Sequence, residues 1–441
     1  MRDLILVFGS LAYLPVIFRS AAAGVLCWEW FSIMNPHRQV YGFANGQPFN
    51  SVIAVVTIMI WLCSAERKRW TPDVMPWLLL LFTGWMTFNS LFAMVPEWSW
   101  QYWDRTVRTF AVVFLAFFVI TGKARVHGLV WAVVIALGYY GIKGGVFVIR
   151  SGGSGLVYGP EGSILADNNQ LALAVVSVLP LAYYLFRHTR SALLKAALLA
   201  TFLLEVLMVL GTQSRGGVIA LATILLVFWV SSDRKAITAV LAIGAVLIGL
   251  RFMPESFFQR MDTLNDVNSD SSFQGRVDAW HVATLVAMDR FPFGAGFYAP
   301  QLPQIFNHYL PDASPHAAHS IYFQVLGEHG FIGLAIFIAI LVLALRNAGL
   351  VIRQTRGVEG LAWAHDLAKM VRTSLIGYYV GGAALSMAYF DGYLIMIAIL
   401  SCLREIVAQA EKRVPAPTSW RSRAPTAASW ITNRKRTPAG Q

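Results

Sequence analysis

Two arginines stand out as side chains that could hold a phosphate. Arg215 lies in the segment Gly211-Thr212-Gln213-Ser214-Arg215-Gly216-Gly217, a short connection between two apolar stretches whose small residues let a ligand approach closely. A guanidinium is planar and can make two parallel hydrogen bonds to a phosphate. Arg276 follows Gln274-Gly275 at the start of an amphipathic stretch. The alternatives are an interfacial Arg215 that extends toward water and an Arg276 on a solvated helix face.

Two histidines precede a long apolar segment, in Pro315-His316-Ala317-Ala318-His319-Ser320. Histidine is the side chain best suited to take a proton near neutral pH. A metal site would need more ligands, and no cysteine or carboxylate nearby completes a set. The residues therefore disfavour a metal and leave two interpretations of His319 open, a proton acceptor and a hydrogen-bonded structural histidine. His316 is a candidate substrate contact or a residue that only positions the loop.

Lys143, within Gly141-Ile142-Lys143-Gly144-Gly145, and Arg150 lie in or beside one apolar segment. Ionisable residues at membrane depth are costly, so each is a functional candidate. We expect the two to hold an anionic ligand, although Lys143 could instead pair with Glu205 or extend to the interface. Asp167-Asn168-Asn169 opens the next segment and predicts a helix cap, with a sugar contact as the alternative.

These side chains must be positioned in a membrane. The 441 residues are 57% hydrophobic and 13% charged, with a mean hydropathy of +0.57. Soluble proteins carry roughly 25% charged residues. The composition excludes a cytosolic enzyme, a disordered chain and a collagen-like chain, and leaves an integral membrane protein with many spans. The three cysteines lie in apolar stretches without metal-binding spacing, which indicates buried thiols.

The sequence predicts an all-α integral membrane protein with about 12 transmembrane helices, since about 20 apolar residues cross a bilayer. The predicted spans, besides a broken helix or hairpin over 4–34 bent at Pro15 and Arg19, are 50–64, 76–94, 107–121, 126–149, 168–186, 192–210, 215–231, 235–252, 319–345, 371–389 and 391–409. We divide the chain into transmembrane helices over 1–253, a large outer loop over 254–318, C-terminal transmembrane helices over 319–410 and a basic disordered tail over 411–441.

Lys and Arg are unevenly distributed between alternate loops, which predicts the orientation. The set that contains the tail holds 23 of these residues, whereas the other set holds 9. The first set is therefore expected to face the cytoplasm, where the tail would contact anionic lipid rather than nucleic acid. The second set, with the loop 254–318, would face the periplasm of a bacterial inner membrane.

The outer loop contains an amphipathic helix over 271–290, capped by Ser271 or Ser272. Its predicted apolar face consists of Phe273, Val277, Trp280, Thr284 and Met288, at spacings of three and four residues. Such a helix can lie at the bilayer surface with Trp280 among the headgroups, or it can pack on the membrane domain.

The chain resembles the bacterial O-antigen ligase and polymerase superfamily. The resemblance is carried by Ser214-Arg215-Gly216-Gly217 between two spans, by Gly275-Arg276 with Trp280 in a long outer loop, and by His319-Ser320 followed by Gly330 and Gly333. The opening Met34-Asn35-Pro36-His37-Arg38 and the stretch from Gly159-Pro160-Glu161-Gly162 to Asp167-Asn168-Asn169 resemble its ligase branch, which includes O-glycosylation ligases. The similarity covers nearly all of residues 1–410.

This resemblance implies a GT-C-like membrane glycosyltransferase that needs neither metal nor ATP. Such ligases transfer a polysaccharide from undecaprenyl diphosphate to a sugar of lipid A–core on the outer face. Arg215 and Arg276 would stabilise the diphosphate leaving group. His319 would take the proton of the acceptor hydroxyl, and attack opposite the leaving group would invert the anomeric centre.

Three other functions remain open from the residues. An O-antigen polymerase of the same superfamily needs the same groups, and so does a ligase that modifies a protein Ser or Thr. A transporter of a lipid-linked anion would also use buried charges and many spans, but it would form no covalent product.

Overall fold

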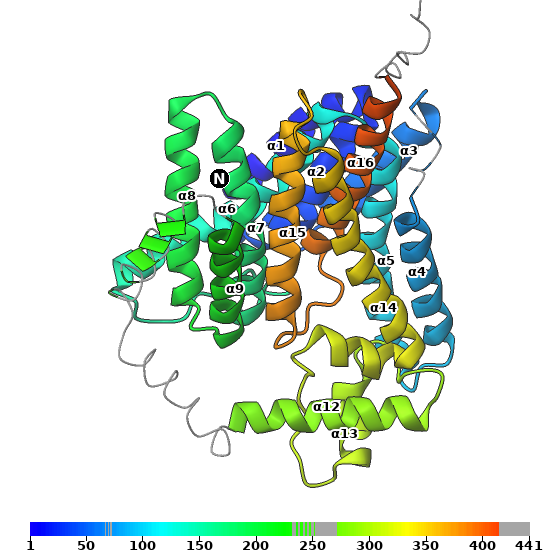
Figure 1. Ribbon diagram of the computed structural model, residues 1–441. Helices are drawn as coiled ribbons and strands as arrows, with labels where there is room; N and C mark the ends of the chain where they lie inside the picture. The colour runs from blue at the N-terminus through cyan, green and yellow to red at the C-terminus, as the bar shows by residue number, and fades with distance from the viewer. Residues whose placement is uncertain are drawn as a thin grey trace, which may run out of the picture.

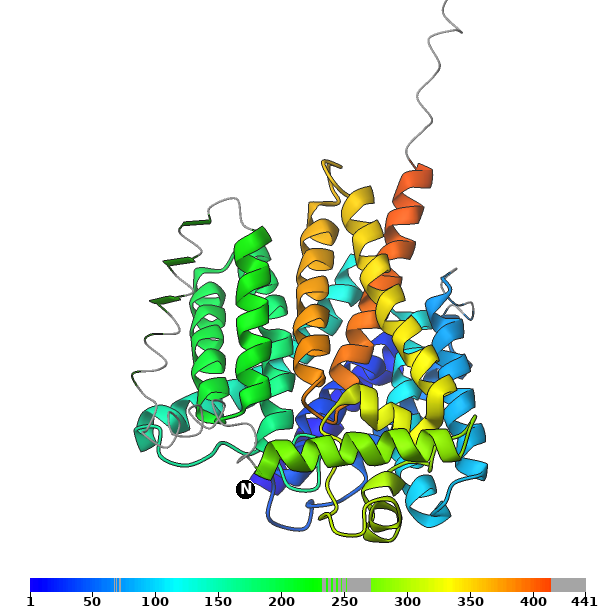
Figure 2. The same cartoon turned by 60° about the horizontal axis from the view of Figure 1, so that its bottom comes forward.

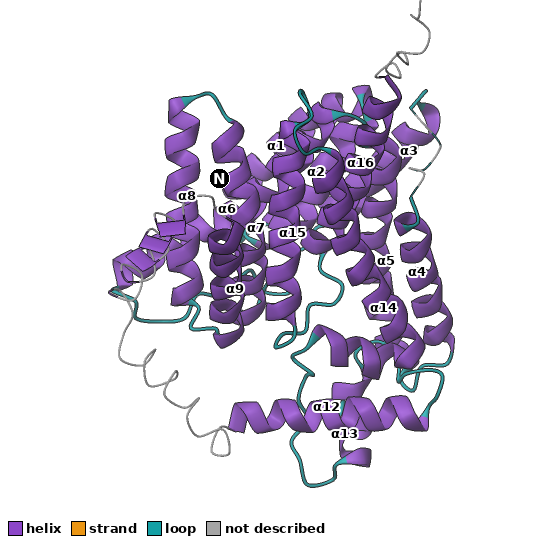
Figure 3. Ribbon diagram, in the orientation of Figure 1, coloured by secondary structure: helices purple, strands orange, loops and turns teal. Residues whose placement is uncertain are grey.

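A computed structural model describes residues 1–231 and 271–413, except for residues 67, 69, 71 and 72, together with isolated positions between 235 and 251. The predicted span 235–252, residues 254–270 of the outer loop and the tail from 414 onward lie wholly or mostly outside the described residues. Within the described part the chain is helical and contains no strand (Figure 3).

The helices follow one another along the chain with short connections in most places (Figure 1). Their bounds are α1 Arg2–Arg19, α2 Ala21–Met34, η1 Pro36–Arg38, α3 Phe49–Cys63, α4 Met75–Leu91, α5 Pro96–Val119, α6 Lys123–Ser151, α7 Asn168–His188, α8 Ala192–Gly211, α9 Arg215–Ser231, α12 Ser271–Asp289, η3 Ala299–Gln301, α13 Pro303–Tyr309, α14 Ile321–Gln354, α15 Ala362–Gly382 and α16 Asp391–Arg413.

Several of these helices have the length and composition of membrane spans. Among the described residues, five helices are long and apolar enough to cross a bilayer, namely α6, α7, α8, α14 and α16. Two shorter apolar helices, α3 and α9, accompany them. The structure therefore supports a helical membrane protein, while the count of about 12 spans stays a prediction. The N-terminal break lies at Ser20 between α1 and α2, and Pro15 is inside α1.

Glycines let α6 pack closely on α8. A Cβ placed on Gly145 would lie 2.5 Å from the carbonyl oxygen of Leu204, and one on Gly144 would lie 2.4 Å from Cγ of Met208. Small residues at helix contacts allow two backbones to approach closely. Such packing matters in a membrane, because no hydrophobic force drives helices together in lipid. Helix α8 therefore covers this face of α6.

Helix α12 crosses one end of the bundle nearly at right angles to the other helices (Figures 1 and 2). It buries a row of small residues, including Ala279, Val282 and Val286, against α13, η3 and α14. The predicted apolar face is only partly covered, since Phe273 and Met288 are exposed. Trp280 contacts protein, which favours packing on the membrane domain over insertion among headgroups.

Two predicted spans differ from the helices in the structure, one in where it ends and one in a kink. Helix α15 stops at Gly382, so residues 383–389 of the predicted span 371–389 lie in an irregular segment that ends before α16. Helix α14 is kinked at Gly330, where φ is +69° and ψ is −172°. A Cβ on Gly330 would lie 2.5 Å from the carbonyl oxygens of Pro292 and Phe293, so only glycine fits this close approach.

We predict that Gly330→Ala lowers stability by about 1–3 kcal/mol or more, because alanine is strained at positive φ and its methyl would meet two carbonyl oxygens. Gly349→Ala on the same helix is the matched control, since nothing lies within 4 Å of its Cβ position. Thermal unfolding in detergent measures both. Equal melting temperatures for the two variants would contradict the prediction.

Candidate active site

Arg215 begins α9 directly after a tight turn. Ser214 caps the helix, because its hydroxyl accepts a hydrogen bond from the backbone N–H of Gly217 at 3.1 Å. Gln213 holds a left-handed backbone with φ of +54°. Gly217 packs on α7, where an added Cβ would lie 2.6 Å from Cβ of Ala172. The half-buried Arg215 is thus fixed at a helix N-terminus, where the peptide dipoles favour an anion.

The start of α7 is tied to this turn. The side-chain amide of Asn168 donates to the carbonyl oxygen of Thr212 at 2.8 Å. Asp167 caps α7 by accepting from the backbone N–H of Asn169 at 2.9 Å, as predicted. These hydrogen bonds place the carboxylate of Asp167 at the end of the bundle that carries Arg215.

His319 lies in the irregular segment between α13 and α14, with a left-handed φ of +42°. Such a backbone is uncommon outside glycine, although histidine is enriched there, and it costs about 1–3 kcal/mol. Trp280 supports the segment from α12, because its indole N–H donates to the carbonyl oxygen of Ala318 at 2.6 Å. The same indole stacks on Phe323 at 5.0 Å between ring centroids.

The charges around His319 come from three elements. Burial lowers the pKa of His319 below its usual 6.5, and the positive charge of Arg276 on α12 lowers it further. The carboxylate of Asp167 acts in the opposite direction, and His316 adds a smaller lowering effect. The structure therefore brings His319, Arg276 and Asp167 into electrostatic contact. A lowered pKa leaves the imidazole neutral near pH 7 and able to accept a proton.

The start of α9 at Arg215 and the start of α14 after His319 contact the same connection, which joins α15 to α16. A Cβ on Gly216 would lie 3.2 Å from Cδ1 of Leu385, and one on Gly382 would lie 2.8 Å from Cδ1 of Ile321. Ile321 is two residues after His319. The N-terminus of α9 and the segment of His319 therefore both pack on residues 382–385.

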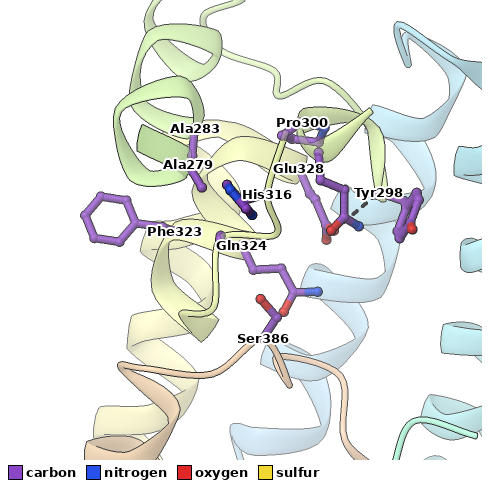
Figure 4. A pocket seen from close by; sticks show the side chains of 11 residues that line it. Ala279, Ala283, Tyr298, Pro300, His316, Phe323, Gln324, Glu328 and Ser386 are labelled. Atoms are coloured by element: carbon purple, nitrogen blue, oxygen red, sulfur yellow. Dashed lines mark hydrogen bonds between the residues drawn. The ribbon is translucent and has the colours of Figure 1, made fainter. Parts of the chain in front are cut away.

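His316 lines a small pocket of about 40 Å³ together with Gln324, Ser386 and Glu328 (Figure 4). Its ring packs on Gly275, where a Cβ would lie 2.6 Å from Cδ2 of the imidazole. His316 is thus a neighbour of Arg276 and remains exposed.

Glu328 is a buried carboxylate in the wall of this pocket that the sequence analysis did not single out. It accepts hydrogen bonds from the hydroxyl of Tyr389 at 2.6 Å and from the backbone N–H of Tyr298 at 3.1 Å. An acidic residue followed by His329 inside an apolar segment is the signal that could have identified it.

A larger cavity of about 540 Å³ adjoins the small pocket, and five residues line both. The shared residues are Tyr298, Gln301, Gln324, Glu328 and Ser386. Other walls come from α2, η1, α5 and residues 386–391, up to the start of α16. Sequence patterns gave no sign of this cavity, because its walls come from segments that are distant along the chain.

Lys143 and Arg150 do not join these groups. Both are exposed on α6, and neither lines the two cavities. The alternative pairing of Lys143 with Glu205 is not formed, since Glu205 packs on Gly141 and its oxygens accept no hydrogen bond from the described residues. Substrate binding by Lys143 and Arg150 stays a prediction. Among the described residues, no group of three or more His, Cys, Asp or Glu could hold a metal ion.

Comparison with known families covers most of the described chain. Residues 200–338, which include Arg215, Arg276, His316 and His319, match the family O-antigen ligase. This match supports the O-antigen ligase and polymerase superfamily over these residues. The predicted resemblance is thereby confirmed. Residues 1–190 match DUF5935, a family of unknown function. No curated protein matches the chain.

We predict opposite shifts in the pKa of His319 for two substitutions. Arg276→Gln removes a positive charge and should raise this pKa, whereas Asp167→Asn removes a negative charge and should lower it. Titration of ¹⁵N-histidine-labelled protein by NMR, assigned with His319→Gln, measures the shift. Arg353→Gln on the exposed end of α14 is the control and should change nothing. Shifts of the same sign for both variants would exclude this arrangement of charges.

Proposed function

We propose that the protein is an O-antigen ligase that transfers a glycan from undecaprenyl diphosphate to a sugar hydroxyl of lipid A–core at the periplasmic face. The observation that carries the proposal is the packing of the loop that holds His319 on Gly275, the neighbour of Arg276, which brings a proton acceptor to a side chain suited to phosphate. Arg215, at a helix N-terminus that packs on the same connection, supports it. The match of residues 200–338 to O-antigen ligase points the same way.

The donor enters with an activated bond, since its leaving group is a diphosphate. Arg215 and Arg276 hold the diphosphate oxygens, and their stabilisation grows as negative charge develops during departure of the glycan. His319 accepts the proton of the acceptor hydroxyl as its oxygen attacks the anomeric carbon. The carbon–oxygen bond to the diphosphate breaks on the opposite face, so the configuration inverts. No metal takes part in this scheme.

Asp167 supports the protonated imidazole. When His319 takes the proton, its positive charge faces Asp167, which favours the charged form. The bound diphosphate also offsets the charge of Arg276. Asp167 acts with or without the donor, whereas the bound diphosphate makes His319 a stronger base only when the donor is in place, which couples proton abstraction to donor binding.

This coupling predicts different pH limbs for two kinetic parameters. The acid limb of kcat/KM reports the free enzyme, and that of kcat reports the complex. We expect the kcat limb to lie at the higher pH, because the bound diphosphate raises the pKa of His319. Initial rates of transfer by purified protein across pH 5–8 measure both limbs (a range of about three units around the ordinary histidine pKa). Coincident limbs in wild-type protein would remove the proposed coupling.

We expect His319→Ala to lower kcat by roughly 10²–10⁴-fold while donor binding survives, because the base is lost but the guanidiniums remain. His316→Ala on the same loop is the matched control and should lose far less. Near-normal turnover of His319→Ala would end the assignment of the base.

Arg215→Lys should also fail, since a point charge does not reproduce the planar fork of the guanidinium. Donor binding should weaken in this variant, unlike in His319→Ala. Full activity of Arg215→Lys would mean that the side chain is structural.

A polymerase of the same superfamily is the second candidate, because the match of residues 200–338 does not separate the two reactions. A deletion strain distinguishes them. Loss of a ligase leaves long polymer on the lipid carrier, whereas loss of a polymerase leaves single repeat units. Transfer of glycan by purified protein from purified donor to purified acceptor would exclude a transporter, and labelled Ser or Thr would indicate a protein acceptor.

A further inference from the structure

The cavity of about 540 Å³ has the size of a ligand site, since small-molecule pockets span roughly 300–1,000 Å³. It is bounded by η1, residues 102–109 of α5 and residues 386–391, up to the start of α16. Arg215 and Arg276 do not line it. It therefore offers a second binding place distinct from the proposed diphosphate site, and it shares part of its wall with the small pocket lined by His316.

Three arginines line the cavity, and they differ in how they are engaged. Arg108 pairs with Asp104 at 2.6 Å and donates to the hydroxyl of Ser51 at 3.1 Å. Arg38 and Arg105 are exposed, and neither side chain makes a hydrogen bond or an ion pair of 4 Å or less among the described residues. Two guanidiniums thus remain available to an anion in the cavity.

The inner wall offers polar groups of the kind that bind sugar hydroxyls. Asp391 accepts hydrogen bonds from the hydroxyls of Ser32 and Thr109, the latter at 2.7 Å. Gln170 and Gln324 also line the wall, and each is oriented by one hydrogen bond to the segment 386–388. Carboxyl and amide groups held in this way can accept from and donate to several hydroxyls of one ligand.

An aromatic pair completes the wall. Tyr102 and Tyr298 both line the cavity, and their rings stack at 4.5 Å with an angle of 11° between planes. Trp98 extends the stack, at 5.2 Å from Tyr298. Such rings combine an apolar face with a polar edge, which suits the apolar face of a sugar ring beside its hydroxyls.

We propose that this cavity binds an anionic sugar of the acceptor, with Arg38 and Arg105 holding its phosphate or carboxylate. The proposal rests on the proposed transfer reaction for the role of the ligand as acceptor. It assigns the cavity to the acceptor because the donor diphosphate already has Arg215 and Arg276. The shared wall with the pocket of His316, three residues before His319, gives an acceptor hydroxyl a path toward the base.

The test uses the full chain in lipid nanodiscs without donor. The probe is delipidated lipid A–core oligosaccharide carrying its phosphates, and the same oligosaccharide after phosphatase treatment or carboxyl reduction. Arg105→Gln should raise the Kd of the untreated probe tenfold or more, because a charge-assisted hydrogen bond is lost. Arg353→Gln, an exposed arginine outside both cavities, is the matched control. Thermal unfolding confirms that each variant is folded.

Each outcome decides the proposal. A loss with Arg105→Gln that phosphatase treatment reproduces supports a phosphate, and one that only carboxyl reduction reproduces supports a carboxylate. An effect of Arg105→Gln no larger than that of Arg353→Gln, or no binding by wild-type protein, overturns the proposal. Weaker binding of undecaprenyl diphosphate rather than of the oligosaccharide overturns the acceptor assignment. Wild-type protein that binds the probe through Arg105 but transfers no glycan would refute only the ligase function.

Discussion

The hydrogen bond from Asn168 to the carbonyl oxygen of Thr212 is the contact on which the candidate active site depends. It fixes the first turn of α7 against the turn that precedes Arg215. Irregular backbone near a membrane needs partners from the protein for its polar groups. The same turn of α7 carries Asp167, whose charge acts on His319. One short polar contact therefore connects the start of α9 to the surroundings of the histidine.

The segment 315–320 is held from a different direction. Trp280 binds its backbone and stacks on Phe323, so α12 and the start of α14 together hold the segment of His319. This explains why a helix outside the predicted spans is part of the site. Arg276 lies one turn before Trp280 on α12, and its charge opposes that of Asp167 at the imidazole. The histidine is thus influenced by a cation and an anion supplied by separate helices.

Much of the site could be predicted from residue types. Arg215, Arg276 and His319 stood out because their neighbours are small, charged or irregular against an apolar background, and Asp167 was predicted as a cap. The cavity with Arg38 and Arg105 could not be predicted, because its walls pack together only in the folded chain. The sequence pattern predicts that residues 383–389 belong to a hydrophobic span. In the structure their backbone leaves the helix, and several of them form a wall of that cavity.

The sequence by itself determined the class of protein and the chemistry available to it, since apolar content and ionisable residues are properties of composition and local order. Its periodicity also located most helices, because each helix forms from neighbouring residues. Only the tertiary structure decided which charges act on His319 and where the irregular segments lie. Electrostatic contacts and cavities depend on distances across the fold, and the linear order of residues does not specify those distances.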